Sequence, residues 1–163
     1  MVLFHGTPIL LGSGARVAAR SRGHQPGRAE FERRFAAYAP VWAGDRATAI
    51  FAADDSAFAA RYLESEPKAK HERHVYQVRA VPISRHPMAL VNFAFKESDP
   101  NAFAVIAREY WQPSRKWCVW EYLCAEIEVV GEERWPDVIA LSVAQAHYFT
   151  DYDAAKRLLR GDG

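Results

Sequence analysis

The sequence predicts an α+β fold in a single domain, residues 1–163, with a mostly antiparallel sheet. Three observations predict it. Strand patterns and helix patterns both occur along the 163 residues, a length typical of one domain. Half of the residues are hydrophobic and 25% are charged, a composition typical of globular chains with a core of their own. No internal repeat occurs, and no linker rich in Pro, Gly or Ser separates two cores.

The first part of the chain contains two expected strands and two expected helices. Pro8 ends the first apolar run, because proline has no N–H to donate to a strand ladder. Asp54 or Asp55 is a good N-cap for the second helix. From the N-terminus, the expected elements are a strand over 2–4, a helix over 28–38, a buried strand over 47–53 and a helix over 56–65.

The remainder of the chain has a clear alternating strand and a clear helix start. Pro100 suits the first position of a helix that follows Asp99. Residues 84–99 have no clear pattern, and residues 111–120 read as a loop rich in tryptophan. The expected elements are a strand over 74–81, a helix over 99–110, a strand over 121–130, a strand over 138–143 and a short basic helix over 153–160.

Charge and composition exclude several classes of protein. The net charge is +1, which disfavours a protein that coats a polyanion through bulk charge. The apolar runs are shorter than the roughly 20 residues of a membrane helix, and the start does not resemble a signal peptide. Cys118 and Cys124 have no metal or redox spacing, so we expect reduced thiols in a cytoplasmic protein. His71 and His74 lack a second pair of ligands, so we expect no metal.

Four short motifs in separate segments are the candidates for a functional site. They are His5-Gly6-Thr7 after the first strand, Phe51-Ala52-Ala53-Asp54 where a strand runs into a helix, Tyr62 on that helix, and Glu121-Tyr122 at the head of the clearest strand. In this order and spacing they resemble the ADP-ribosyltransferases of the His-Tyr-Glu group. That group includes diphtheria-type toxins, poly(ADP-ribose) polymerases and bacterial rifampicin ADP-ribosyltransferases.

The resemblance implies both a fold and an activity. The fold would be a split antiparallel sheet with peripheral helices around an NAD cleft. The activity would be mono-ADP-ribosyl transfer, in which NAD+ is the co-substrate and nicotinamide is released. The acceptor is left open among a protein, a nucleic acid and a small molecule; a membrane partner is not expected.

Glu121 is the expected catalytic acid. NAD cleavage develops positive charge on the ribose, and a fixed carboxylate stabilises that charge more in the transition state than in the ground state. Glu121 has the parity of Leu123 and the later odd-numbered apolar residues, so we expect its side chain on the apolar face. By resemblance, it would bond the 2′-hydroxyl of the nicotinamide ribose. The alternative is a solvated acid at a strand end.

Phe51 and Tyr62 are expected to hold the nicotinamide ring. A flat cationic ring is attracted to aromatic faces by about 0.5–2 kcal/mol each. The two residues have the spacing of the aromatic pair in the family, whereas the alternative is that both are ordinary core residues. Phe51 departs from the family, which usually has tyrosine there, so stacking is kept and any hydroxyl bond is lost.

The first motif is expected to bind the rest of NAD. By resemblance, the Gly6 backbone would bind the nicotinamide carboxamide, and His5 would bond a ribose hydroxyl and orient NAD for catalysis. Thr7 either serves the same ribose or caps the turn. The alternative for His5 is a structural histidine at a strand end.

Two basic or aromatic segments are expected beside this site. The loop before Glu121 would face the acceptor, as it does in the family, through Trp111, Arg115 and Trp117; Trp120 is expected to fill the core. Arg16, Arg20, Arg22 and Arg28 would reach the NAD pyrophosphate or a nucleic acid, or form a solvated loop.

Three alternatives to the transferase remain open from the sequence. One is an NAD glycohydrolase, with water as the acceptor. Another is a catalytically impaired module on the same fold that binds NAD, ADP-ribose or nucleic acid. The third is a nucleic-acid binder that uses only the arginines and tryptophans.

Overall fold

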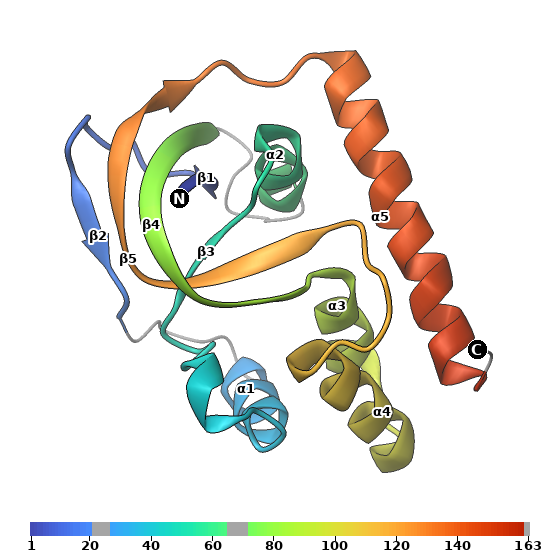
Figure 1. Ribbon diagram of the computed structural model, residues 1–163. Helices are drawn as coiled ribbons and strands as arrows, with labels where there is room; N and C mark the ends of the chain where they lie inside the picture. The colour runs from blue at the N-terminus through green and yellow to red at the C-terminus, as the bar shows by residue number, and fades with distance from the viewer. Residues whose placement is uncertain (21–26, 65–71, 162–163) are drawn as a thin grey trace.

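The computed structural model describes residues 1–20, 27–64 and 72–161, and it has an α+β fold (Figure 1). In chain order the elements are β1 (Val2–Thr7), β2 (Arg16–Ala18), α1 (Arg28–Ala36), the 3-10 helix η1 (Val41–Ala43), β3 (Ile50–Ala52), α2 (Ser56–Glu64), β4 (His74–Pro87), α3 (Ala89–Lys96), α4 (Pro100–Trp111), β5 (Trp120–Glu133) and α5 (Val138–Leu159).

The sheet is built on the two longest strands, β4 and β5, which curve strongly (Figure 1). They pair antiparallel from Val75 opposite Glu133 to Pro87 opposite Trp120. β1 pairs with the other edge of β4, while β2 and β3 share the other edge of β5. All these pairings are antiparallel, as the sequence predicts.

The curvature brings β1 back to the end of β3. Phe4 and Ala53 exchange two backbone hydrogen bonds of 2.8 Å each, although they are far apart in the sequence. Ala53 directly follows β3, and Phe4 lies inside β1. The first and second candidate motifs are therefore neighbours in space.

A bulge divides β5 into two parts with different faces. Cys124 lies opposite Pro82 and Ile127 opposite Ala80, so three steps along β5 match two along β4. One extra residue reverses which side chains face each side of a sheet. Leu123 packs toward the helices, whereas Ile127 packs on the opposite side. The prediction of one face for the odd positions 121–129 is therefore wrong past residue 124.

The larger core cluster lies where α1, α3 and α4 meet the end of the sheet, in the lower part of Figure 1. Phe31 and Phe35 on α1 stack with ring centroids 5.1 Å apart. Trp111, at the end of α4, donates its indole N–H to the Phe35 carbonyl at 2.8 Å. A second cluster is formed mainly by the strands and includes Leu3 of β1 and Tyr76 and Val78 of β4.

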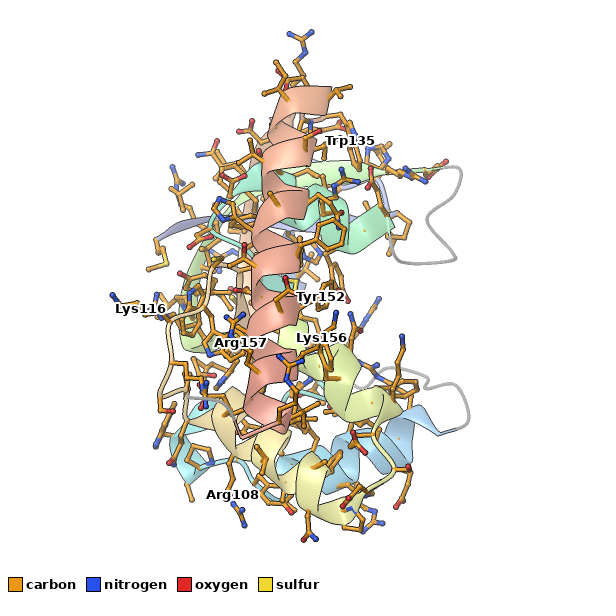
Figure 2. All side chains as sticks on the ribbon, turned by 90° about the vertical axis from the view of Figure 1, so that its right-hand side faces the viewer. Arg108, Lys116, Trp135, Tyr152, Lys156 and Arg157 are labelled. Atoms are coloured by element: carbon orange, nitrogen blue, oxygen red, sulfur yellow. The ribbon has the colours of Figure 1, made fainter. Side chains whose placement is uncertain are left out.

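The long helix α5 runs along one side of the molecule and packs against α2, α3 and α4 (Figures 1 and 2). Its N-cap is Asp137, whose carboxylate accepts from the Ala140 N–H at 2.8 Å. The predicted strand over 138–143 is therefore wrong, because its apolar run belongs to a capped helix. The basic helix predicted over 153–160 corresponds to the last turns of α5, where Figure 2 shows Lys156 and Arg157.

The other expected elements agree with the structure within a few residues. The helices predicted over 28–38, 56–65 and 99–110 are α1, α2 and α4. The unassigned residues 84–99 form the end of β4 and α3. Among the described helices, none has both the length and the apolar character of a membrane span. The cytoplasmic location stays a prediction.

Candidate functional site

Gly6 lies at the contact between β1 and α2. A Cβ atom at this position would lie 2.7 Å from the Ala59 carbonyl oxygen of α2, which is too close for real atoms. Glycine therefore allows α2 to pack directly on β1. Since α2 also carries Tyr62, Gly6 sets how closely the Tyr62 helix approaches the first motif.

His5 and Thr7 both have defined partners. The Nδ1–H of His5 donates to the Phe51 carbonyl at 2.7 Å, so the imidazole links the first motif to the second. The hydroxyl oxygen of the buried Thr7 accepts from the Ile9 N–H at 3.2 Å. This bond fits the expectation that Thr7 caps the turn; its contact with a ribose stays a prediction.

One cavity gathers the first two motifs. Its volume is about 800 Å³, within the range of small-molecule sites. It is lined by His5, Gly6, Thr7, Phe51 and Tyr62, together with apolar and basic neighbours that include Ile9, Leu11, Arg16 and Arg20. The expected NAD-binding residues therefore surround a single space.

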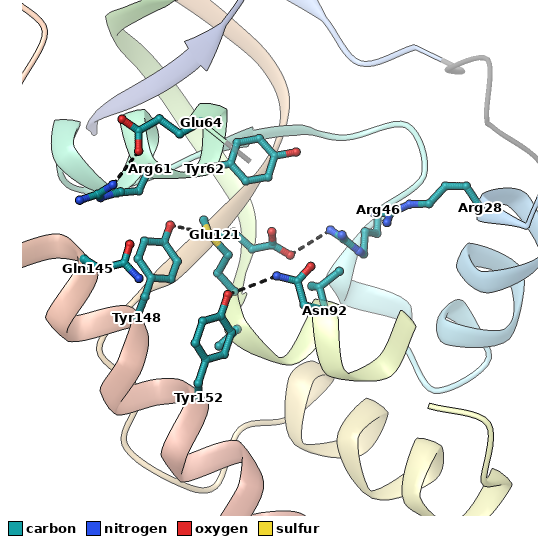
Figure 3. Close-up of a pocket in the computed structure, with 13 residues that line it drawn as sticks. Arg28, Arg46, Arg61, Tyr62, Glu64, Asn92, Glu121, Gln145, Tyr148 and Tyr152 are labelled. Carbon is teal, nitrogen blue, oxygen red and sulfur yellow. Dashed lines mark hydrogen bonds and ion pairs between the residues drawn. The ribbon is translucent and has the colours of Figure 1, made fainter. Parts of the chain in front are cut away.

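A second cavity contains Glu121. Its volume is about 440 Å³, and Tyr62 lines it as well as the first cavity. Its walls also carry polar side chains from α2, α3 and α5, shown in Figure 3 as Arg61, Glu64, Asn92, Gln145, Tyr148 and Tyr152. Tyr62 is thus the boundary between the expected catalytic acid and the other motifs.

Glu121 is buried and paired. Its carboxylate Oε1 accepts from the Arg46 guanidinium at 2.9 Å and from the Tyr110 hydroxyl (Figure 3 shows the Arg46 bond). The side chain is 2% exposed and that of Arg46 is 4% exposed. The alternative of a solvated acid at a strand end is therefore wrong.

The pair belongs to a larger buried network of charges. Arg46 Nε lies 3.5 Å from Glu32 Oε2 of α1, and Glu32 Oε1 lies 3.2 Å from the Arg28 guanidinium. The Arg46 guanidinium also lies over the Phe51 ring, 4.6 Å from its centroid. Phe51 and Glu121 thus contact the same cation, and one face of Phe51 is covered by it.

Burial dominates the electrostatics of this network. Loss of water raises the pKa of the Glu121 carboxyl, while Arg46 and the Tyr110 bond act against that rise without cancelling it. Burial alone would lower the pKa of Arg46, but the Glu121 charge and its neighbours outweigh this and raise it. Burial and then the Glu121 charge raise the pKa of Tyr110. Arg46 therefore stays charged and Tyr110 stays neutral.

The two oxygens of Glu121 differ. Arg46 and Tyr110 both donate to Oε1, and no residue that the structure describes donates to Oε2. Glu121 lines the cavity, so Oε2 is the oxygen left for a ligand.

The loop before Glu121 differs from the expectation. Trp111 is 1% exposed and Trp117 is 6% exposed, so neither indole forms a surface on which an acceptor could stack. The Trp117 indole N–H donates to Glu109 at 3.0 Å, and the same carboxylate accepts from the Arg115 backbone N–H at 3.0 Å. The prediction that the two tryptophans face an acceptor is wrong, because both are buried in the core cluster. Trp120 is half-buried, and the acceptor role of Arg115 stays a prediction.

The predicted basic segment is divided among different contacts. Arg16 on β2 lies 3.6 Å from Glu126 and 3.7 Å from Glu128 of β5, so it is held on the sheet surface. Arg28 lines the second cavity, and Arg20 lines the first. Arg22 lies outside the described residues.

No cluster of three or more His, Cys, Asp or Glu side chains that could hold a metal occurs within residues 1–20, 27–64 and 72–161. His74 Nδ1 lies 2.7 Å from Glu132, while His71 is outside those ranges. Both cysteines are free thiols.

Sequence reasoning missed Arg46, Tyr110 and Glu32. Arg46 lies in a short turn before β3, where a solvated arginine is the usual expectation. Tyr110 and Glu32 lie on helices and carry no motif. Only tertiary packing brings Arg46 and Tyr110 to Glu121, and Glu32 to Arg46, so the sequence contains no signal for them.

Comparisons of the chain with protein-family models, with curated proteins and with solved structures found no match. The geometry of the two adjoining cavities is therefore the basis for assigning a function.

Proposed function

We propose that this chain is a mono-ADP-ribosyltransferase that cleaves NAD+, transfers ADP-ribose to an acceptor and releases nicotinamide. The observation that carries the proposal is the shared position of Tyr62. It lines both the cavity of His5, Gly6, Thr7 and Phe51 and the cavity of Glu121. A curled antiparallel sheet with helices around it is compatible with the ADP-ribosyltransferase-like fold.

The chemistry needs a stabilised cation. The bond between ribose C1′ and the nicotinamide nitrogen breaks, and its electron pair leaves with neutral nicotinamide. A lone pair of the acceptor then forms the new bond to C1′, and the acceptor proton goes to solvent. Glu121 stabilises the oxocarbenium-like ribose between these events, because a preorganised carboxylate in a dry site needs little reorganisation.

The other residues would bind and orient NAD+. The aromatic ring of Tyr62 offers a face to the nicotinamide cation at the boundary of the two cavities. His5, bonded to Phe51, and Gly6, packed under α2, line the first cavity together with Tyr62. No metal takes part in the proposal.

The test is nicotinamide release from NAD+, measured by chromatography. We expect release by the wild-type protein, and a rate about 10²–10³-fold lower for Glu121→Gln. Glu126→Gln is the matched control, since Glu126 lies on the same strand with an exposed side chain. Absence of release by the wild type, or equal rates for wild type and Glu121→Gln, would contradict the proposal. Free ADP-ribose as the main product would instead identify an NAD glycohydrolase.

The Arg46 contacts favour a second candidate, a module that binds NAD+ or ADP-ribose without turnover. In this candidate, the Arg46 cation compensates the Glu121 charge and covers one face of Phe51, so the two residues contribute to the binding site and not to a reaction. Calorimetric binding of NAD+ together with no nicotinamide release would support this candidate.

A further inference from the structure

Arg46 is a charged side chain in a place where few charged side chains occur. It is 4% exposed and contacts elements from four parts of the chain. These contacts are to Glu121 on β5, Glu32 on α1, and the rings of Phe51 on β3 and Tyr110 on α4. Burying a guanidinium is strongly unfavourable unless its partners are well placed, so these contacts restrict the position of the Arg46 side chain.

The turn that carries Arg46 is itself fixed. The Asp45 carboxylate accepts from the Ala47 N–H at 2.9 Å, and the Asp45 carbonyl accepts from the Ala49 N–H at 3.0 Å. Gly44 before it has a φ of 81°, a conformation that glycine adopts without strain. The hydrogen-bonded turn therefore holds the Arg46 backbone in one conformation, from which its side chain reaches Glu121.

Tyr110 completes the support of the carboxylate. Its hydroxyl donates to Oε1, the same oxygen that Arg46 contacts. Its ring stacks on His86 with centroids 4.6 Å apart, and His86 Nδ1 donates to the Tyr110 carbonyl at 2.9 Å. Two donors on one oxygen fix the rotation of a carboxylate, and Oε2 receives no bond from the described residues.

We propose that Arg46 and Tyr110 are positioning residues for the reaction, which hold Glu121 through Oε1 so that Oε2 meets the ribose of NAD+. The inference rests on the proposed function, because it assigns residues that make that function efficient. In this proposal, the binding of NAD+ depends mainly on the cavity lined by His5, Gly6 and Phe51. Loss of positioning therefore lowers kcat more than it raises KM.

Glu32 provides a second test of the proposal, because its effect on Glu121 is opposite to that of Arg46. Glu32 and Glu121 both pair with the Arg46 cation. The distance between Arg46 Nε and Glu32 Oε2 is 3.5 Å, which is an ion pair without a hydrogen bond. The charge of Glu32 raises the pKa of Glu121, whereas Arg46 lowers it. The titratable or charged groups around Glu121 come from every element packed against it. They are Arg46 from the turn before β3, His86 opposite Glu121 on β4, Tyr110 from α4, Glu32 and Arg28 from α1, Arg61, Tyr62 and Glu64 from α2, and Tyr148 from α5.

The first experiment measures steady-state NAD+ cleavage by Arg46→Met and Tyr110→Phe. For Arg46→Met we expect kcat to fall about 10²-fold while KM for NAD+ stays within about threefold. For Tyr110→Phe we expect a smaller fall, about tenfold, because one donor and the ring remain. Arg46→Lys should recover only part of the loss, since lysine keeps the charge but not the guanidinium geometry. Arg33→Met is the matched control, an exposed arginine on α1.

The second experiment records kcat against pH. Arg46→Met should move the acid limb of the profile to higher pH, and Glu32→Gln should move it to lower pH. Loosened packing alone would not produce shifts of opposite sign. Circular dichroism confirms that each variant is folded, and Tyr110→Phe and Glu32→Gln keep the test decisive if Arg46→Met does not fold.

The proposal is overturned if the folded variants keep the wild-type kcat, or if both charge variants move the limb in the same direction. Absence of nicotinamide release by the wild type is a different result. It removes the proposed function before any variant is compared.

Discussion

Arg46 and Glu121 form an ion pair of 2.9 Å in which both side chains are almost completely buried, 75 positions apart in the sequence. Such a pair contributes little net stability, but removing one partner leaves a charge in the core without compensation. This asymmetry predicts the outcome of a double-mutant cycle.

Arg46→Met should lower the free energy of unfolding by about 3–5 kcal/mol, because Glu121 would remain as an unpaired buried acid. Adding Glu121→Gln should recover part of that loss, since the unpaired charge is then gone. Urea denaturation of the wild type, both single variants and the double variant measures the coupling. Additive effects of the two substitutions would contradict the pairing.

Gly6→Ala should destabilise the protein by about 1–3 kcal/mol, because the new methyl group would lie 2.7 Å from the Ala59 carbonyl oxygen. Because the clash is with backbone, β1 and α2 would have to move apart, so NAD+ affinity should fall together with stability. Gly131→Ala on β5 is the control, since a Cβ there meets nothing within 4 Å. Thermal unfolding and NAD+ titration of the two variants give the comparison, and equal behaviour would show that α2 does not need Gly6.

The sequence predicts the main elements of this fold because most of them depend on local signals. Asp99 caps α4 and Pro100 starts it, as expected from the sequence alone. The prediction of a strand over 138–143 is wrong because a short apolar run does not by itself distinguish a strand from a helix. There the decisive feature was the cap at Asp137, which stands before the run.

The candidate site could be predicted only in part. The motif residues His5, Phe51 and Tyr62 line one cavity, a grouping expected from the resemblance and the order of the motifs. The partners of Glu121 could not be predicted, because Arg46 and Tyr110 reach it through tertiary packing. The core positions of Trp111 and Trp117 depend on the same long-range contacts.

His86 predicts how stability depends on pH. The side chain is fully buried, and burial lowers its pKa to about 4, below the ordinary value near 6.5. A histidine held neutral in the folded state stabilises the protein above its unfolded pKa, and this contribution is lost as pH falls toward the folded pKa.

The free energy of unfolding should therefore fall between about pH 6.5 and 4, with a slope from His86 that approaches about 1.4 kcal/mol per pH unit. His86→Gln keeps groups that can bond the Tyr110 carbonyl and Ser84 but does not titrate, so its decline should be shallower. Urea midpoints at pH 7, 6 and 5 for the two proteins provide the measurement. Identical slopes would mean that His86 does not titrate differently on unfolding.

Tyr62 should determine how tightly NAD+ binds, because it lines both cavities. Tyr62→Ala should raise the dissociation constant of NAD+ about 2–30-fold, the equivalent of one aromatic contact to a cation. Tyr62→Phe keeps the ring and should stay close to the wild type. Tyr38→Ala serves as the second control, since Tyr38 lies beside Phe103 in the helical cluster and lines neither cavity. Calorimetric titration with NAD+ compares the four proteins, and an unchanged affinity in Tyr62→Ala would separate the two cavities and remove the main support for a single site.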